Sequence, residues 1–144
     1  MSDTLYEIYI HIVFGTYSGK NLIPNEAINN LHGYIAKIFA NMKCHDICVG
    51  GINNHVHILT SLPKYNLIPE IVKSVKIATN QMLIKQYELH NFAWQKGYAA
   101  FSVRPQEIAK VKNYIKNQRK HHMQTSYENE MKKFEMLCRK LRLC

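Results

Sequence analysis

Two histidines separated by one residue are the first feature of this sequence that could take part in chemistry. His55 and His57 flank a valine in the apolar segment 54–59, which is typical of a buried strand. Because side chains at positions i and i+2 of a strand point to the same face, both imidazoles leave the strand on one side. Two neutral imidazoles placed together can bind one metal ion. A polar surface at a sheet edge would show the same pair, so the two histidines alone leave both interpretations open.

A second group of polar side chains lies near the C-terminus. Tyr114 and Gln118 are four residues apart in an expected helix, so they share one face, and His122 continues the same line. A tyrosine hydroxyl with an ordinary pKa of about 10 is a weak nucleophile. A metal ion that polarises a phosphate would overcome this weakness, and the Gln118 amide oxygen is a neutral ligand for such an ion. Alternatively, Tyr114 packs and Gln118 is solvated, and the spacing alone favours this alternative.

The elements that would position these residues follow from the spacing of apolar side chains. The expected strands cover residues 5–14, 44–50, 55–62 and 98–103. The expected helices run from Pro24 through Met42 and cover 69–89 and 105–122. Thr125-x-x-Glu128 resembles a capping box that would begin a last helix.

The order β-α-β-β-α-β predicts an α+β fold with a ferredoxin-like antiparallel sheet, helices on one of its faces, and two further C-terminal helices. In this topology the first and third strands are central neighbours. His11 would then share the open face with His55 and His57, because both strands direct their aliphatic residues to the other side. We therefore take His11, together with His122, as candidates for residues that contact the metal ligands.

Composition narrows the class of protein. With 144 residues, the chain is expected to form one domain over 1–144. Its formal net charge of +9 favours a polyanionic partner, nucleic acid or an anionic membrane surface, although a basic protein without such a partner is the alternative. No apolar run approaches the ~20 residues of a membrane-spanning helix, and the N-terminus lacks a signal-peptide pattern, so we expect a cytoplasmic protein. The four cysteines show no two-residue spacing and favour reduced thiols.

Taken together, the motifs resemble the single-tyrosine HUH transposases of bacterial insertion sequences, the TnpA-like family. The resemblance follows the order of the family's segments and covers nearly the whole chain. Its segments here are Ile10–Phe14, Asn54–Leu59, Phe92–Val103 and Tyr114–His122. Asn54 departs from the family, since an acidic residue is frequent at this position in relatives.

The resemblance implies a transposase that cleaves and rejoins single-stranded DNA at the ends of an insertion sequence. Tyr114 would attack the scissile phosphate, form a 5′-phosphotyrosine and release a 3′-hydroxyl. His55, His57 and Gln118 would bind a divalent cation, which is Mg²⁺ or Mn²⁺ in this family.

The resemblance also implies a homodimer that binds DNA hairpins, in which the tyrosine helix of one subunit completes the histidine site of the other. The candidate DNA contacts are Lys20, Lys73, Lys76 and Arg104. Two other functions stay open. One is a domesticated relative that processes chromosomal repeats with the same chemistry. The other is a non-catalytic ferredoxin-like module that binds nucleic acid on exposed aromatic side chains.

Overall fold

The computed structural model describes residues 4–17 and 22–142, and its centre is one antiparallel sheet with the spatial order β2-β3-β1-β4. The strands are β1 (Tyr9–Gly15), β2 (Cys48–Ile52), β3 (His55–Ser61) and β4 (Ala99–Val103). With β1 and β3 as central neighbours, this is the ferredoxin-like order. The α+β class expected from the sequence is therefore confirmed.

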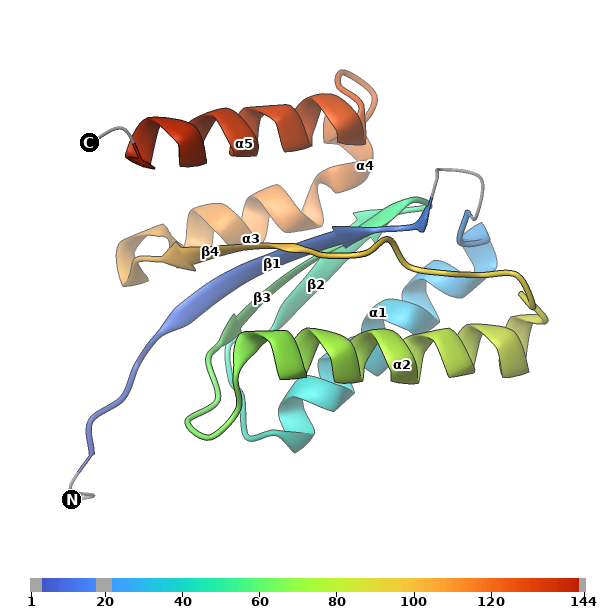
Figure 1. Ribbon diagram of the computed structural model, residues 1–144, viewed down its shortest axis with the longest axis horizontal. Coiled ribbons are helices and arrows are strands. Elements are labelled where there is room, and N and C mark those ends of the chain that lie inside the picture. The colour runs from blue at the N-terminus through green and yellow to red at the C-terminus, as the bar shows by residue number, and fades with distance from the viewer. Residues whose placement is uncertain (1–3, 18–21, 143–144) are drawn as a thin grey trace.

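Helices cover both faces of the sheet (Figure 1). On one face lie α1 (Asn25–Asn41) and α2 (Ile68–Tyr87); on the other lie α3 (Ile108–Lys116) and α5 (Tyr127–Arg142), with the short α4 (Gln118–His121) between them in sequence. A 3₁₀ turn, η2 (Pro105–Glu107), precedes α3. In the part of the chain that the structure describes, no helix combines the length and apolar character needed to cross a membrane.

The main hydrophobic core lies between the sheet and the helices α1 and α2. The core side chains of the two central strands are Ile10, Ile12, Phe14, Val56 and Ile58. Burying an aliphatic or aromatic side chain of this size contributes about 1.5–3 kcal/mol. If either strand shifted its register by one residue, its whole apolar set would leave the core. Burial of this set therefore also determines which residues of β1 and β3 point to the second face of the sheet. Those residues include the three histidines expected on the open face, and all three are buried.

A smaller apolar cluster attaches α3 to that second face. Ile115 of α3 packs against Cys48 and Leu59. The helix approaches β2 closely at Gly50, where an added Cβ would lie 2.4 Å from the carbonyl oxygen of Ile115. The absence of a side chain at Gly50 therefore allows α3 to pack directly on the sheet, beside the histidines.

Gly50→Ala is expected to displace α3 and to lower the free energy of unfolding by about 1–3 kcal/mol, since backbone atoms cannot yield as a flexible side chain does. Urea unfolding would measure the change. Gly33→Ala is the matched control, because an added Cβ at this position of α1 meets nothing within 4 Å. A Gly50→Ala variant as stable as the wild type would contradict the close packing of α3 on β2.

The first two strands differ from the sequence-based boundaries. β1 begins at Tyr9 rather than at residue 5, and β2 covers Cys48–Ile52 rather than 44–50. The segment before β2 is not extended because Lys43 and Asp46 have positive φ angles of 66° and 54°. Such left-handed residues form turns and interrupt a strand.

The C-terminal helices also differ from expectation. The single helix expected over 105–122 is divided into η2, α3 and α4, and the break lies at Asn117, where φ is −98° and ψ is 20°. The expected capping box at Thr125 is displaced by one residue. The backbone N–H of Asn129 donates to the Ser126 hydroxyl at 3.2 Å, so Ser126 caps α5.

Candidate active site

The two strand histidines form the floor of a polar cluster between the sheet and the C-terminal helices. His55 and His57 are fully buried, and their ring centroids are 5.0 Å apart. Neither belongs to the main core, and both contact side chains of the C-terminal helices, which cover the other face of the sheet. The alternative of an exposed polar surface at a sheet edge therefore does not describe this pair.

One neighbour fixes the ring of His55. Its Nδ1 lies 2.8 Å from the Oδ1 atom of Asn54, which only accepts, so Nδ1 carries the hydrogen. Burial, followed by the electrostatic effect of the neighbouring His57, lowers the pKa of His55 to about 3, so the ring is neutral. The Nε2 atom of His55 is thus left with a free lone pair, which is the atom and the protonation state that a metal ion requires.

His11 is in contact with the second strand histidine. Its Nε2 lies 2.8 Å from Nδ1 of His57, and the two rings are stacked with centroids 5.0 Å apart. Burial and the neighbouring His57 lower the pKa of His11 to about 3, so a neutral ring makes this contact. A hydrogen bond on the far nitrogen of a metal-binding histidine typically sets the ring's orientation.

Tyr114 and Gln118 reach the same cluster from above the sheet. The ring centroid of Tyr114 lies 5.5 Å from that of His57, and the Gln118 Oε1 atom lies 3.0 Å from Nε2 of His55. The Gln118 Nε2 group donates to the backbone carbonyl of Tyr114 at 3.2 Å, which turns the amide oxygen toward the histidines. Burial and the contact with Glu130 raise the pKa of Tyr114 well above its ordinary value.

These four residues meet within one chain. The resemblance had implied that an isolated subunit lacks a complete site, because the tyrosine helix would come from a partner. In the structure α3 lies on the sheet of its own chain, and the Ile115 contacts hold it there. A second subunit is therefore not required by the geometry to bring Tyr114 to the histidines.

Glu130 of α5 is a site residue that the sequence reasoning missed. Its side chain is buried, and Oε1 lies 3.0 Å from Nε2 of His57. Its Oε2 atom accepts a hydrogen bond from the Tyr114 hydroxyl and lies 3.1 Å from Nε2 of His121. Burial raises the pKa of Glu130, but the hydrogen bond from His57 and the electrostatic effect of that ring outweigh it and lower this pKa to about 2. The clue in the sequence was a carboxylate within the apolar stripe of the last helix.

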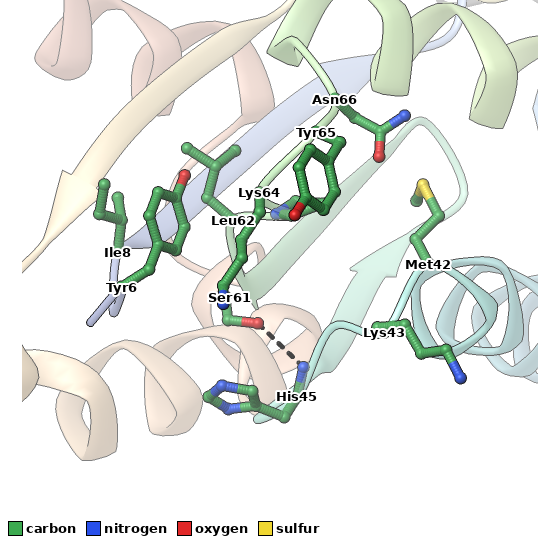
Figure 2. A pocket seen from close by; sticks show the side chains of 11 residues that line it. Tyr6, Ile8, Met42, Lys43, His45, Ser61, Leu62, Lys64, Tyr65 and Asn66 are labelled. Atoms are coloured by element: carbon green, nitrogen blue, oxygen red, sulfur yellow. Dashed lines mark hydrogen bonds between the residues drawn. The ribbon is translucent and has the colours of Figure 1, made fainter. Parts of the chain in front are cut away.

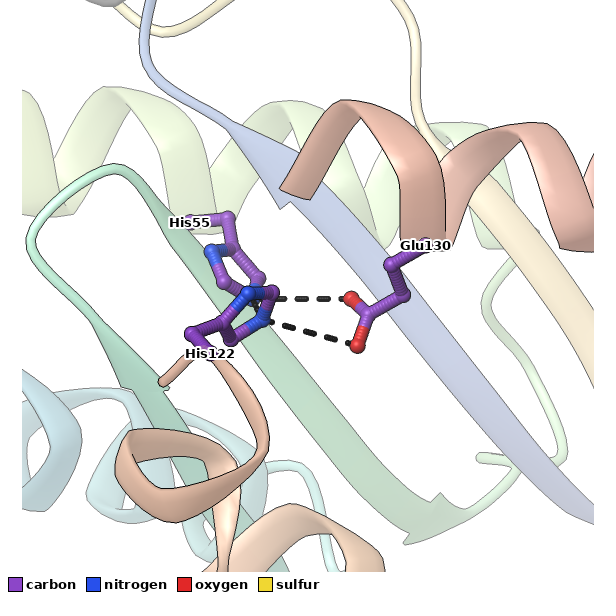
Figure 3. Close-up of side chains that lie close together, drawn as sticks. All are labelled: His55, His122 and Glu130. Carbon is purple, nitrogen blue, oxygen red and sulfur yellow. Dashed lines mark hydrogen bonds and ion pairs between the residues drawn. The ribbon is translucent and has the colours of Figure 1, made fainter. Parts of the chain in front are cut away.

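The cluster includes a set of side chains suited to a metal ion. His55, His122 and Glu130 offer ligand atoms that all lie within 4.8 Å of one another (Figure 3). They come from β3, from the end of α4 and from α5, which converge only in the folded chain. This group of imidazoles and a carboxylate, in which His55 and Glu130 are buried, can bind a divalent cation.

A comparison with protein-family models gives one match, to the family described as "Transposase IS200 like", over residues 4–118. The chain belongs to this IS200-like transposase family. The family suggested by the sequence motifs is thereby confirmed. The matched segment contains His55, His57, Tyr114 and Gln118, whereas His122 and Glu130 follow it.

Two solved structures resemble the fold of this IS200-like transposase. A Deinococcus radiodurans R1 protein assigned as a transposase superposes with a TM-score of 0.62 at 20% identity, over 82% of this chain and 95% of that one. A REP-associated tyrosine transposase bound to a REP hairpin gives a TM-score of 0.58 at 15% identity, over 85% of this chain and 74% of that one. At these identities the comparison supports the fold alone. No curated protein matches the chain.

The basic residues chosen from the sequence of this transposase do not gather at the cluster. Lys20 lies outside the described residues. Lys73 and Lys76 belong to α2, on the opposite face of the sheet (Figure 1). The Lys76 ammonium donates to the carbonyl oxygens of Gln95 and Gly97 at 2.8 and 2.6 Å, which holds the segment before β4. Arg104 is exposed and pairs with Glu107 at 3.0 Å. Their contact with DNA stays a prediction.

A separate hollow lies at the opposite end of β3 (Figure 2). The backbone N–H of His45 donates to the Ser61 hydroxyl there at 2.9 Å, which ties the turn before β2 to the end of β3. The residues that line this hollow include Tyr6, Lys43, His45 and Tyr65, and none of them belongs to the histidine cluster. The Tyr114 cluster is therefore the better candidate for the reaction centre.

Proposed function

We propose that this transposase cleaves and rejoins single-stranded DNA through a covalent 5′-phosphotyrosine at Tyr114. The observation that carries the proposal is the Tyr114 side chain within hydrogen-bonding reach of a buried cluster of imidazole and carboxylate groups suited to a metal ion. Metal-assisted phosphoryl transfer needs these two components beside each other.

The reaction is a balanced exchange of phosphate esters. The Tyr114 oxygen forms a bond to phosphorus as the bond from phosphorus to the 3′ oxygen of the DNA breaks. The hydroxyl proton of Tyr114 leaves, and the departing 3′ oxygen takes up a proton. In the reverse direction a 3′-hydroxyl attacks the phosphotyrosine and frees Tyr114. Since one ester replaces another, rejoining needs no nucleotide cofactor.

His55, His57 and Gln118 would hold the divalent cation, Mg²⁺ or Mn²⁺, which when bound supplies polarisation of the scissile phosphate. Asn54 supports this role at His55, because it contacts the Nδ1 atom and leaves the Nε2 atom free toward the cluster. At His57, His11 contacts the Nδ1 atom, and the Nε2 atom would exchange its hydrogen bond to Glu130 for the ion. The hydrogen bond to Glu130 holds the Tyr114 hydroxyl on the same side.

DNA would reach Tyr114 through a hollow between α3 and α5. Its lining includes Tyr114 and His11 together with the exposed Lys110 and Lys133. Two lysines beside the nucleophile are suited to binding the phosphates of a single strand. The net charge of +9 and a structural relative bound to a REP hairpin support a DNA partner with hairpin ends.

A covalent-adduct assay tests the proposal. Purified protein would be incubated with Mg²⁺ or Mn²⁺ and single-stranded oligonucleotides that cover the sequences flanking its gene. We expect a protease-sensitive DNA–protein adduct on a denaturing gel. If no oligonucleotide gives an adduct while hairpins still bind, the non-catalytic binding module becomes the better interpretation.

We further propose, from the family resemblance, that the active form is a homodimer, and a mixing experiment tests whether its sites are shared. Tyr114→Phe subunits would be mixed with His57→Ala subunits, and adduct formation measured. Because α3 contacts the sheet of its own chain, we expect the mixture to stay inactive. Restored activity would instead establish that the tyrosine helix is exchanged between subunits, since only then does one site keep both residues.

A further inference from the structure

We propose that His122 and Glu130 are further ligands of the metal ion, in addition to His55, His57 and Gln118. The inference rests on the proposed function for the presence of the ion. It adds two residues to the ligand set of that proposal, and both follow the segment matched by the family model, which ends at residue 118. The consequence is an ion enclosed by the last helix of this chain.

The orientation of His122 is the first reason. Its Nδ1 atom lies 2.8 Å from the backbone carbonyl oxygen of Thr125, which only accepts, so Nδ1 carries the hydrogen. The lone pair is therefore on Nε2, which lies 3.0 Å from Nε2 of His55 and 2.8 Å from Oε1 of Gln118. The His122 side chain is only 4% exposed, and distances this short leave no room for water between the atoms.

These short distances join atoms that do not donate to one another. The contact with Asn54 leaves His55 with its lone pair on Nε2, and Gln118 turns its amide oxygen to the same point. Three electron-rich atoms at 2.8–3.0 Å repel one another unless a positive charge lies among them. Neighbouring ligands of an octahedral ion, at bond lengths of about 2.1 Å, lie about 3 Å apart. The spacing therefore fits ligands around one cation.

Glu130 supplies the negative charge on the remaining side. One carboxylate oxygen lies 3.6 Å from Nε2 of His55, and the other lies 3.5 Å from Nε2 of His122 (Figure 3). The first oxygen also lies 3.0 Å from Nε2 of His57. The residue is 2% exposed. A buried carboxylate is stabilised by nearby positive charge, and a divalent cation among the imidazoles would add to the contacts that Glu130 makes with His57 and Tyr114.

Aromatic contacts on both sides of Glu130 hold the last helix in place. The Tyr127 ring is stacked on the His55 ring at a centroid distance of 4.4 Å, and the Phe134 ring lies 4.9 Å from that of Phe101 in β4. These residues lie about one turn before and after the carboxylate. The placement of Glu130 thus follows from packing of the inward face of α5 on the sheet.

The enlarged ligand set also indicates which ions the site binds. Imidazole ligands favour Mn²⁺ and the later transition metals over Mg²⁺, and a third imidazole increases this preference. We therefore expect the protein to bind Mn²⁺ more tightly than Mg²⁺ in the absence of DNA.

Calorimetric titration of the full-length protein with Mn²⁺, without DNA, tests the assignment. Glu130→Gln and His122→Ala are each expected to weaken the Kd for Mn²⁺ by about 10-fold or more, as loss of groups around a bound metal commonly does. Glu128→Gln, an exposed carboxylate of the same helix, and His90→Ala, an exposed histidine, are the matched controls and should bind as the wild type does. Far-UV circular dichroism checks that each variant is folded.

The outcomes separate this inference from the proposed function. Weaker Mn²⁺ binding in both variants, with unchanged controls, supports His122 and Glu130 as metal ligands. If both folded variants bind Mn²⁺ as the wild type does and the wild type forms the DNA adduct, the inference is wrong and the proposed function stands. Faster adduct formation by Glu130→Gln with unchanged Mn²⁺ affinity would likewise overturn it, because Glu130 would then only obstruct the phosphate. Absence of the adduct with intact metal binding would contradict the proposed function alone.

Discussion

Replacing Tyr114 with phenylalanine is expected to abolish the covalent DNA adduct and to lower strand cleavage by at least roughly 10³-fold, because removal of a covalent nucleophile costs this much or more. The change removes one oxygen atom and keeps the ring. The ring contacts with His57 and His11, at centroid distances of 5.5 and 6.4 Å, remain available. The loss of activity would therefore report the missing hydroxyl rather than a displaced helix. Adduct formation on a denaturing gel and cleavage of a labelled strand measure the two effects.

A second tyrosine in the same cluster provides the matched control. The Tyr127 ring is stacked on His55, so Tyr127→Phe removes a hydroxyl from the same site without removing the proposed nucleophile. We expect Tyr127→Phe to retain the adduct. An adduct that persists in Tyr114→Phe and disappears in Tyr127→Phe would show that the nucleophile is on α5 instead of α3. Hairpin binding should be unchanged in both variants, because neither substitution removes a positively charged side chain.

The sequence predicts the sheet and the histidine face well because both depend on a local pattern. Alternation along β1 and β3 assigns every residue to one face, and the apolar set can be buried in one register only. His11 and the β3 histidines could therefore be placed together before the structure was known. The one-turn spacing of Tyr114 and Gln118 likewise predicts that both side chains reach one site, and they do so although the helix is interrupted at Asn117 between them.

Glu130 could not be found in this way, because its role depends on where α5 packs. The helix is interrupted at Asn117, and the chain turns again before Ser126. These two turns determine where the last helix packs on the sheet. Local spacing does not encode them. The sequence likewise does not determine whether α3 packs on the sheet of its own chain or on that of a second subunit. Ile115 would make the same contacts with the sheet of either subunit, so the residue pattern does not distinguish the two arrangements.

The His57→Ala variant is expected to lose strand cleavage by at least roughly 10²-fold, since metal-site residues contribute at this level, and to keep hairpin affinity close to that of the wild type. His57 joins two parts of the site, because its Nδ1 contacts His11 and its Nε2 faces Glu130. Its loss leaves a buried carboxylate with one partner fewer. Hairpin binding depends instead on contacts to phosphates by basic side chains, which the substitution leaves in place.

Cleavage of a labelled strand and fluorescence anisotropy with a labelled hairpin, at one salt concentration, separate these two effects. His57→Gln serves as a second variant, because it fills more of the buried space and keeps a polar atom there. His45→Ala, at the opposite end of β3, is the control for loss of a histidine beside the sheet. If both His57 variants are folded by circular dichroism and still cleave at the wild-type rate, His57 is not a metal ligand. If both His57 variants lose hairpin binding together with their folded structure, the role of His57 is to stabilise the fold. Its buried contact with His11 would then account for this stabilisation.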